Sequence, residues 1–337
     1  MSGVSDLPLA VSIGDPAGVG PEIIARAFAQ RFELALPPFV VIGSGAVIGD
    51  AAVACGIDLA WSELNHRGVE GIWPDALPVI DDAFRGYRYR PGEPDRAGAE
   101  MALVALESAI DRVKAGHTAA VVTAPVAKSA IAQIAPGFVG QTEFLAAACG
   151  LPADDAVMML AGPSLRTVPM TVHCALADVP ARLSSELIVT RSRIVARALT
   201  TDFGIARPRL AIAGLNPHAG EDGRMGSEEA TIIAPAIARL RAEGIDATGP
   251  HPADTLFAPH KRGSYDVAIA MYHDQALVPI KALDFDEGVN VTLGLPIVRT
   301  SPDHGTAFDI AGKGTARPEA MIAAIRMAAD IARRRSR

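Results

Sequence analysis

The sequence lacks the features that mark secreted, membrane-spanning or disulfide-bonded proteins. Its longest apolar stretches are short and interrupted, so we expect no span through a membrane. The first residues carry an aspartate and no basic region ahead of their apolar run, which does not fit a secretory signal. The three cysteines, Cys55, Cys149 and Cys174, lie far apart without metal-type spacing. They are expected to be reduced core residues of a cytoplasmic protein.

An excess of basic residues is also lacking. The chain has 31 Lys and Arg against 38 Asp and Glu, a formal net charge of −7. This mildly acidic, unclustered balance argues against nucleic acid as the main partner. It does not exclude phosphate binding, which needs only a local group of cations.

We find no internal repeat and no low-complexity tract in the 337 residues, and this length is too great for one small core. Short apolar runs alternate with helical patterns, which predicts an α/β fold with mainly parallel sheets and helices on their faces. The expected strands are Leu9–Ile13, Phe39–Ile42, Ala119–Val122, Val157–Leu160, Thr167–Val172, Leu210–Ala213 and Val267–Met271. The expected helices are Pro21–Gln30, Gly98–Ala115, Gln141–Cys149, Leu183–Leu199, Gly226–Glu243 and Pro318–Arg335.

A glycine-rich turn follows the first expected strand, with the sequence SIGDPAGVGPEI at residues 12–23. Pro21 suits the first position of a helix, and backbone N–H groups there could meet an anion. The segment is not G-x-G-x-x-G, and it lacks the Lys-Ser/Thr of a phosphate loop. A tight structural turn and a ligand-binding loop are equally compatible with it.

Three histidines follow three different expected strands. His173 ends TVPMTVH, His218 follows LAIAGLNP, and His273 follows VAIAMY. The carboxyl ends of parallel strands share one edge of a sheet, so these side chains could converge on one ion. Neutral imidazoles bind zinc, cobalt and other divalent metals, and three of them leave a coordination position for a substrate. For each histidine alone, a structural position at a strand end is the simpler interpretation.

Cationic and amide side chains follow the His273 segment. Lys281, Asn290 and Arg299 together suit a phosphate or carboxylate group, although each alone would more often be a surface residue. Further on, SPDHGTAFDIAGKGTARPEA at residues 301–320 is rich in glycine and small residues. Such a composition favours a loop whose backbone closely approaches a ligand.

Long segments of the chain resemble the 4-hydroxythreonine-4-phosphate dehydrogenase family of vitamin B6 biosynthesis, from about residue 8 to about residue 330. The segments are SIGDPAGVGPEI, VTAPVAKSAI, GQTEFLA, TVHCAL, GLNPHAGEDGRMGSEE, PADTLF, MYHDQALVPIK and GVNVTLGLPIVRTSPDHGTAFDIAGKG. The last of them also looks like the adenosine-binding loop of isopropylmalate and isocitrate dehydrogenases. The family binds its nucleotide on a different loop system from the Rossmann fold.

The resemblance implies an isocitrate/isopropylmalate dehydrogenase-like fold, with two α/β/α domains, mainly parallel sheets and an active site in the interdomain cleft. Residues 1–130 plus 300–337 would form a cofactor-side domain, and residues 131–299 a domain for metal, substrate and dimerisation. It also implies a homodimer in which the active site is shared, with the third metal-binding histidine supplied by the partner subunit.

Family roles carry over to individual residues. The metal ligands fall on His173, His218 and His273, and the substrate contacts on Thr142, Lys281, Asn290 and Arg299. The cofactor loop falls on His304, Gly305, Thr306 and Asp309. Position 141 departs from the family pattern, because Gln141 stands where the family usually has histidine. Glutamine still donates and accepts a hydrogen bond at this substrate-binding position, but it cannot become a cation.

The activity that the resemblance implies is a metal-assisted alcohol oxidation with NAD or NADP and one divalent ion, zinc, magnesium or cobalt, per site. The substrate would be 4-phosphooxy-L-threonine. Its product, 2-amino-3-oxo-4-phosphooxybutanoate, decarboxylates to 3-amino-2-oxopropyl phosphate. Asp254 and Asp274 are candidates for proton transfer or for orienting a ligand.

Two alternatives stay open from the sequence. A paralogous dehydrogenase on the same scaffold would oxidise 4-phospho-threonate, 4-phospho-erythronate or a dihydrodiol dicarboxylate. A three-histidine metal hydrolase would turn over without NAD or NADP, but it leaves the HGTAFDIAGKG segment unexplained.

Overall fold

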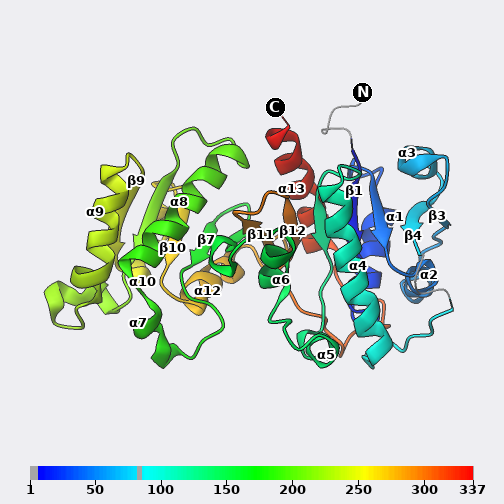
Figure 1. Cartoon of the computed structure of the whole chain (residues 1–337), viewed down its shortest axis with the longest axis horizontal. Coiled ribbons are helices and arrows are strands. Elements are labelled where there is room, and N and C mark those ends of the chain that lie inside the picture. The colour runs from blue at the N-terminus through cyan, green and yellow to red at the C-terminus, as the bar shows by residue number, and fades with distance from the viewer. Residues whose placement is uncertain (1–6, 82–85, 337) are drawn as a thin grey trace. The chain divides into compact units, whose positions relative to one another are not determined.

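The computed structural model describes residues 7–81 and 86–336. The chain divides by its internal contacts into two compact units, the first formed by Met1–Leu151 with Leu295–Arg337 and the second by Pro152–Gly294. The elements of each unit can be followed in Figure 1. The division differs from the sequence-based domains mainly at residues 131–151. They belong to the first unit, where the helix Lys128–Ile134 packs against the helix Arg96–Lys114 and Gln141 accepts a hydrogen bond from Thr123.

The first unit is a parallel sheet with helices around it. Its strands run in the order β3-β4-β2-β1-β5-β12, and the pairs among them are parallel. The strands are β1 (Leu9–Ser12), β2 (Phe39–Ile42), β3 (Trp61–Glu63), β4 (Leu77–Ile80), β5 (Val121–Thr123) and β12 (Arg299–Pro302). The helices are α1 (Gly20–Ala29), α2 (Gly45–Ala54), α3 (Gly68–Ile72), α4 (Arg96–Lys114), α5 (Lys128–Ile134), α6 (Gln141–Ala148) and α13 (Glu319–Arg335).

Local sequence explains the central elements of this unit. Strands β1 and β2 are buried along their whole length, as expected for apolar runs in a sheet covered on both faces. Helix α1 has Pro21 in its first turn, where the missing N–H costs nothing. Helix α4 begins behind Asp95, whose carboxylate accepts a hydrogen bond from the N–H of Gly98 at 2.7 Å.

The second unit mixes parallel and antiparallel pairing. Its strands run in the order β11-β6-β7-β10-β8-β9, and β6 is antiparallel to both of its neighbours. The strands are β6 (Val157–Ala161), β7 (Arg166–Pro169), β8 (Arg209–Ala213), β9 (Asp246–His251), β10 (Val267–Ala270) and β11 (Val289–Leu293). The helices are α7 (Val179–Arg182), α8 (Ser185–Thr201), α9 (Ala234–Ala242), α10 (Ala253–Leu256), α11 (Pro259–Arg262) and α12 (His273–Leu283).

Helix α12 covers one face of this second sheet. Its Ala276, Leu277 and Ile280 pack in one buried cluster with Ala268 and Ala270 of β10. Helix α8 packs against β6 and β8, and begins where the Ser184 hydroxyl accepts a hydrogen bond from the N–H of Leu187 at 3.1 Å. The small alanines of β10 let α12 approach closely, which fixes the position of its first residue, His273.

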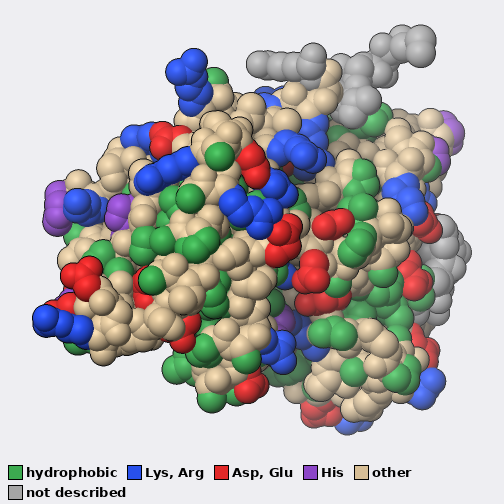
Figure 2. All heavy atoms as spheres, turned by 60° about the vertical axis from the view of Figure 1, so that its left-hand side comes forward, with side chains coloured by type: hydrophobic (Ala, Val, Ile, Leu, Met, Phe, Trp, Pro, Cys, Tyr) green, Lys and Arg blue, Asp and Glu red, His purple; other side chains and the backbone are tan. Residues whose placement is uncertain are grey.

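The predicted α/β class with mainly parallel strands is therefore confirmed. The sequence patterns missed the strands β3, β4, β9, β11 and β12 and the helices α2, α3, α5, α7, α10, α11 and α12. Among the described residues, no helix combines the length and apolarity needed to cross a bilayer. On the face drawn in Figure 2, the described acidic and basic side chains are interspersed and do not gather in one basic field.

Candidate functional site

The three strands that precede the candidate metal ligands are neighbours. Strand β10 lies between β7 and β8 and is parallel to both. Their carboxyl ends, at Pro169, Ala213 and Ala270, therefore lie at one edge of the second sheet. This is the edge where open α/β sheets bind ligands.

His173 and His273 lie close together at this edge. The N–H of Thr171 donates to Met271 O at 3.2 Å, and its hydroxyl donates to the same oxygen at 2.9 Å. These bonds hold the two chain segments side by side, and the imidazole centroids are 6.2 Å apart with the rings tilted by 40°. Both histidines line a cavity of about 470 Å³ together with Tyr272.

Asp274 contacts the neighbouring histidine. Its Oδ1 lies 2.7 Å from Nδ1 of His273, the first residue of α12. A carboxylate on one ring nitrogen fixes the orientation of the imidazole and leaves Nε2 for a ligand. This position suits an orienting role for Asp274. Asp254, the other candidate, is exposed on α10, which contacts the loop that carries His218.

His218 lies on a strained loop. The backbone from His218 to Asp222 has positive φ at every residue, and four of these five residues are not glycine. Non-glycine residues in this region cost on the order of 1–2 kcal/mol each, and such strain persists only where surrounding contacts enforce it. His173 also has a positive φ, of 47°. Strain of this kind clusters at functional sites.

A buried carboxylate enforces the His218 loop. Glu229 is 6% exposed, and its Oε1 accepts hydrogen bonds from the N–H groups of Leu215 and Asn216, both at 2.8 Å. Its Oε2 accepts a third from the Asn216 side chain at 2.9 Å. Glu229 begins a π-helical turn at Glu229–Ile233, a distortion often found at functional sites.

The described residues of one chain do not by themselves form the donor arrangement that a three-ligand metal site requires. Within residues 7–81 and 86–336, no group of three or more His, Cys, Asp or Glu side chains is arranged to hold a metal ion. The convergence of the three imidazoles on one ion stays a prediction, with His273 expected from the partner subunit. His218 lies beyond the end of β8, on the loop Pro217–Gly223. Imidazoles facing a shared cavity nevertheless fit the donor set of a divalent transition metal.

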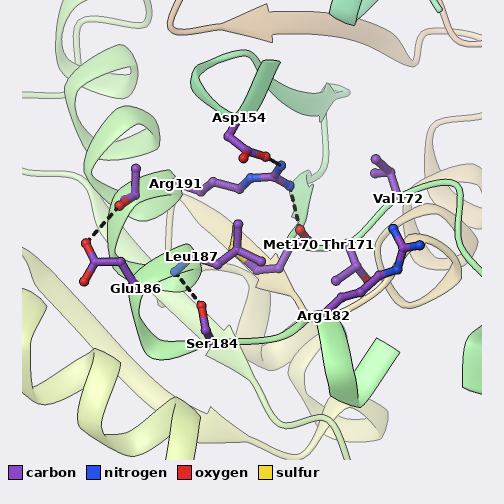
Figure 3. A pocket seen from close by; sticks show the side chains of 10 residues that line it. Asp154, Met170, Thr171, Val172, Arg182, Ser184, Glu186, Leu187 and Arg191 are labelled. Atoms are coloured by element: carbon purple, nitrogen blue, oxygen red, sulfur yellow. Dashed lines mark hydrogen bonds and ion pairs between the residues drawn. The ribbon is translucent and has the colours of Figure 1, made fainter. Parts of the chain in front are cut away.

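A second cavity of about 550 Å³ lies behind the His173 segment, between α8 and the end of β7 (Figure 3). Arg191 of α8 reaches across it, donating to Met170 O at 2.6 Å and to Asp154 Oδ1 at 3.1 Å. Its side chain is only 13% exposed. Because Met170 lies three positions before His173, this guanidinium fixes the start of the histidine segment.

In the first unit, Arg299 and Gln141 lie in contact. Arg299 Nη2 donates to Thr123 Oγ1 at 2.7 Å and to the amide oxygen of Gln141. Thr123 donates to the same amide oxygen at 2.6 Å. Gln141 Nε2 donates to Ala124 O at 3.3 Å, which sets the orientation of the amide. The residue that replaces the family's usual histidine is thus a neutral acceptor for a guanidinium.

Arg299 is held in a nearly closed environment. It is 4% exposed, and burial lowers its pKa to about 10, a shift that the charge of Glu143 partly offsets. The guanidinium stays charged near neutral pH. A buried cation held by neutral groups such as Thr123 and Gln141 attracts an anionic group.

The other candidate anion contacts lie on three elements. Thr142 is in the first turn of α6, Lys281 in the last turn of α12, and Asn290 on β11. The Asn290 side-chain oxygen is buried and has no hydrogen-bond partner among the described residues. A buried amide without a partner costs free energy unless a ligand or water pairs with it. The Asn290 oxygen is therefore an acceptor for a hydroxyl, an amine or a water, and an anion would meet the amide nitrogen instead.

The glycine-rich turn at residues 12–23 is a structural scaffold. The N–H groups of Asp15, Ala17 and Gly18 donate to Pro125 O, to the Asp15 carboxylate and to Asp15 O, at 2.9, 3.0 and 3.0 Å. Gly14 has φ 73°, and a Cβ there would lie 2.4 Å from Pro125 O, so only glycine fits. These bonds give the turn a structural role, and the ligand-binding alternative stays a prediction.

This scaffold positions the loop that contains the candidate cofactor residues. The N–H of Val19 donates to Thr306 O at 2.9 Å. One helical turn on, Glu22 accepts from the N–H of Gly312, and Arg26 donates to Gly314 O. His304 and Asp309 are exposed along the loop, as is Gly305. Glu22 and Arg26 of α1 thus hold the two glycines, Gly312 and Gly314, near the end of this loop.

The sequence did not point to Glu22, Arg26, Arg191, Glu229 or Gln275. Each is a polar residue inside a buried or half-buried helical segment. A polar residue on an otherwise buried helix face was the available signal, since buried charges and amides require partners. No local sequence pattern predicts which groups these side chains bind.

A model of the family described as pyridoxal phosphate biosynthetic protein PdxA matches residues 35–328. The 4-hydroxythreonine-4-phosphate dehydrogenase of Erythrobacter litoralis is 60% identical over 330 residues, covering 98% of each chain. The crystal structure of the enzyme of that name from Klebsiella pneumoniae has a TM-score of 0.84 at 37% identity, covering 97% of this chain and 98% of the other. A terephthalate 1,2-cis-dihydrodiol dehydrogenase from Burkholderia xenovorans LB400 has a TM-score of 0.63 at 33% identity, covering 96% and 98%.

Proposed function

The chain belongs to the PdxA family of pyridoxal phosphate biosynthetic proteins, and from this premise we propose that it oxidises 4-phosphooxy-L-threonine with NAD or NADP. The product would be 2-amino-3-oxo-4-phosphooxybutanoate, which loses carbon dioxide to give 3-amino-2-oxopropyl phosphate. The relatives named above are dehydrogenases, so the chain is an oxidoreductase by family. The observation that supports an anionic substrate is the buried guanidinium of Arg299, which Thr123 and Gln141 hold in place.

The proposed metal ligands are His173 and His218 of one chain and His273 of a second copy in a homodimer. The strained backbone at His173 and His218 supports this assignment, as does the lack of a three-ligand group within the described residues of one chain. A divalent ion there would act as a Lewis acid that lowers the pKa of the substrate hydroxyl. Asp274 would hold His273 in the orientation that presents Nε2.

Substrate orientation would come from the cationic and amide side chains. Arg299 is fixed by Thr123 and Gln141, so it meets an anionic group without losing side-chain freedom on binding. Lys281, Asn290 and Thr142 would complete the grip on phosphate or carboxylate. Gln141 would act mainly on Arg299, since its oxygen already accepts two hydrogen bonds.

The nucleotide would bind along residues 304–309, on the loop that Val19, Glu22 and Arg26 hold. Bound nicotinamide would accept the hydride from the substrate carbon. The pinned glycines let a ligand approach the backbone closely without a large ordering cost. Asp254, exposed beside the His218 loop, is the proposed acceptor of the proton that the substrate hydroxyl loses.

The test is a steady-state assay of the full-length protein with 4-phosphooxy-L-threonine, with either nucleotide and with zinc, magnesium or cobalt restored after chelation. Reduction of the nucleotide that depends on both substrate and metal is the expected result. No reduction with any phosphorylated substrate, from a folded protein that binds metal, would refute the proposal.

A second candidate follows from the dihydrodiol dehydrogenase neighbour, whose fold and length this chain shares. A dihydrodiol dicarboxylate also carries anionic groups that Arg299 could bind. Parallel rates with a cyclic dihydrodiol dicarboxylate, 4-phospho-threonate and 4-phospho-erythronate separate the candidates. The phosphorylated amino acid should have the highest kcat/KM.

A further inference from the structure

Gln275 connects two of the histidine segments through one side chain. It lies in the first turn of α12, two positions after His273, and is 8% exposed. Its amide oxygen accepts a hydrogen bond from the N–H of Met271 at 2.6 Å, and its amide nitrogen donates to Gly214 O at 2.8 Å. Met271 lies just before His273, and Gly214 begins the loop that leads to His218.

The same residue, Met271, also contacts the His173 segment. Met271 O accepts both the N–H and the hydroxyl of Thr171, two positions before His173. The end of β10 is thus a junction. Thr171 binds the Met271 carbonyl and Gln275 binds the Met271 N–H. The segments that lead to His173, His218 and His273 are therefore connected by a short series of hydrogen bonds.

Glutamine suits this place better than either of its closest relatives. A leucine of similar size would leave the Met271 N–H and the Gly214 carbonyl without their partner, and a buried group so left costs about 1–3 kcal/mol. A glutamate could accept from Met271 but could not donate to Gly214 O. Only a neutral amide satisfies both ends, and it adds no charge beside the imidazoles.

We propose that Gln275 is a positioning residue for metal binding, which sets the place of the His218 loop relative to the start of α12. The inference rests on the proposed role of the three histidines as metal ligands. Residues that orient metal ligands are typically worth roughly 10–100-fold in metal affinity. Since His273 is proposed to serve the ion of the second copy, Gln275 would tie together the ligand loops of two ions.

A purely structural role makes a different prediction, and Asp266 supplies the matched control. Asp266 joins the same two strands at their opposite ends, accepting from the N–H of Arg209 at 2.8 Å and from its guanidinium at 3.0 and 3.1 Å. Asp266→Ala therefore loosens β8 from β10 far along the strands from the histidines. Its effect on folding stability should resemble that of a Gln275 variant, without an effect on metal binding.

The experiment titrates the full-length, metal-free protein with cobalt and records affinity and the visible spectrum of the bound ion, alongside the unfolding midpoint. Gln275→Leu should weaken cobalt binding roughly 10–100-fold and change the spectrum, because the ligand geometry is altered. Gln275→Glu, which keeps the bond to Met271, should weaken it less and gives the decisive comparison if the leucine variant does not fold. Asp266→Ala should bind as the unchanged protein does.

Cobalt affinity and spectrum that stay unchanged in Gln275→Leu, or in Gln275→Glu where the former does not fold, would overturn the inference and leave the amide a structural role. Equal weakening by Asp266→Ala would do the same. His218→Ala tests the premise separately, because unchanged cobalt binding there would refute the proposed metal site itself.

Discussion

In the first unit the candidate functional side chain is itself buried, whereas in the second the buried groups are those that hold the candidate ligands. Arg299 is 4% exposed and contacts neutral partners, Thr123 and Gln141. In the second unit His173 and His273 line an open cavity, and the closed positions belong to Gln275 and Glu229.

The difference follows from the sign of the charge that each region is suited to bind. A site for an anion needs a fixed cation. Burial strengthens the attraction between that cation and the anion, as long as no second positive group competes for the anion. A site for a metal cation needs imidazole nitrogens as ligands, so its supporting groups are amides or carboxylates that fix the orientation of the ligand segments. Gln141 in place of histidine fits the first rule.

Removing a proposed ligand should have the largest effect. His173→Ala should lower metal-dependent kcat by roughly a thousandfold or more, because the ion then lacks an imidazole that fixes its position. Cobalt affinity and nucleotide reduction are the measurements. His260→Ala, an exposed histidine on α11, is the matched control and should change neither. Full metal-dependent activity in His173→Ala would place the ion elsewhere.

Arg299→Met should separate function from stability. Loss of the charged hydrogen bonds to the substrate should lower kcat/KM by roughly 10–100-fold. The free energy of unfolding should stay equal or rise by up to about 3 kcal/mol, because a guanidinium whose pKa is depressed to about 10 is held charged at a cost. Urea titration and steady-state kinetics check the two parts.

The exposed Arg96, paired with Glu100 on α4, gives the control Arg96→Met, for which neither quantity should change. Clear destabilisation by Arg299→Met would mean that this buried cation stabilises the first unit. The buried group of the first unit would then have a structural role, as the buried groups of the second unit do.

A smaller effect is expected at the cofactor loop. Glu22→Gln replaces a carboxylate acceptor for the Gly312 N–H by a neutral one, a loss of about 1 kcal/mol in that contact. The KM for the nucleotide should rise by about fivefold with kcat nearly unchanged. Glu33→Gln, an exposed residue beyond the end of α1, is the control. An unchanged KM for the nucleotide would mean that the loop keeps its place without this carboxylate.

The smallest effects concern pH, and they have opposite signs in the two units. Burial, with the charges of Lys261 and Arg241, lowers the pKa of His251 below its ordinary 6.5, so the stability it contributes is lost as pH falls through that window. Burial raises the pKa of Asp15 above its ordinary 3.8, so stability is lost as pH rises through the range just above 3.8.

His251→Gln should therefore flatten the acid side of the stability profile, and Asp15→Asn should flatten the fall above pH 3.8. Both changes should be on the order of 1 kcal/mol or less. Urea unfolding at a series of pH values measures them. If both variants changed the slope of unfolding free energy against pH in the same direction, the opposite signs predicted for His251 and Asp15 would be contradicted.

The local sequence predicts many of the strands and helices. The buried runs at β1, β2 and β10 have strand composition. His173, His218 and His273 lie in the segments that follow three strands, and these strands prove to be adjacent and parallel. The short β3 and the helix α12 were missed, because a three-residue strand has no measurable period and α12 begins with polar residues.

What the sequence by itself determined is which segments are buried and which residue types end them, since burial leaves a period of two or 3.6 in neighbouring positions. The tertiary structure alone decided that Gln141 meets Arg299, that Glu22 holds Gly312, and that Gln275 joins Met271 to Gly214. These bonds connect positions far apart in the chain. The packing of strands and helices determines which groups become partners. A contact between side chains or backbone groups on different elements does not alter the local periodicity of the sequence.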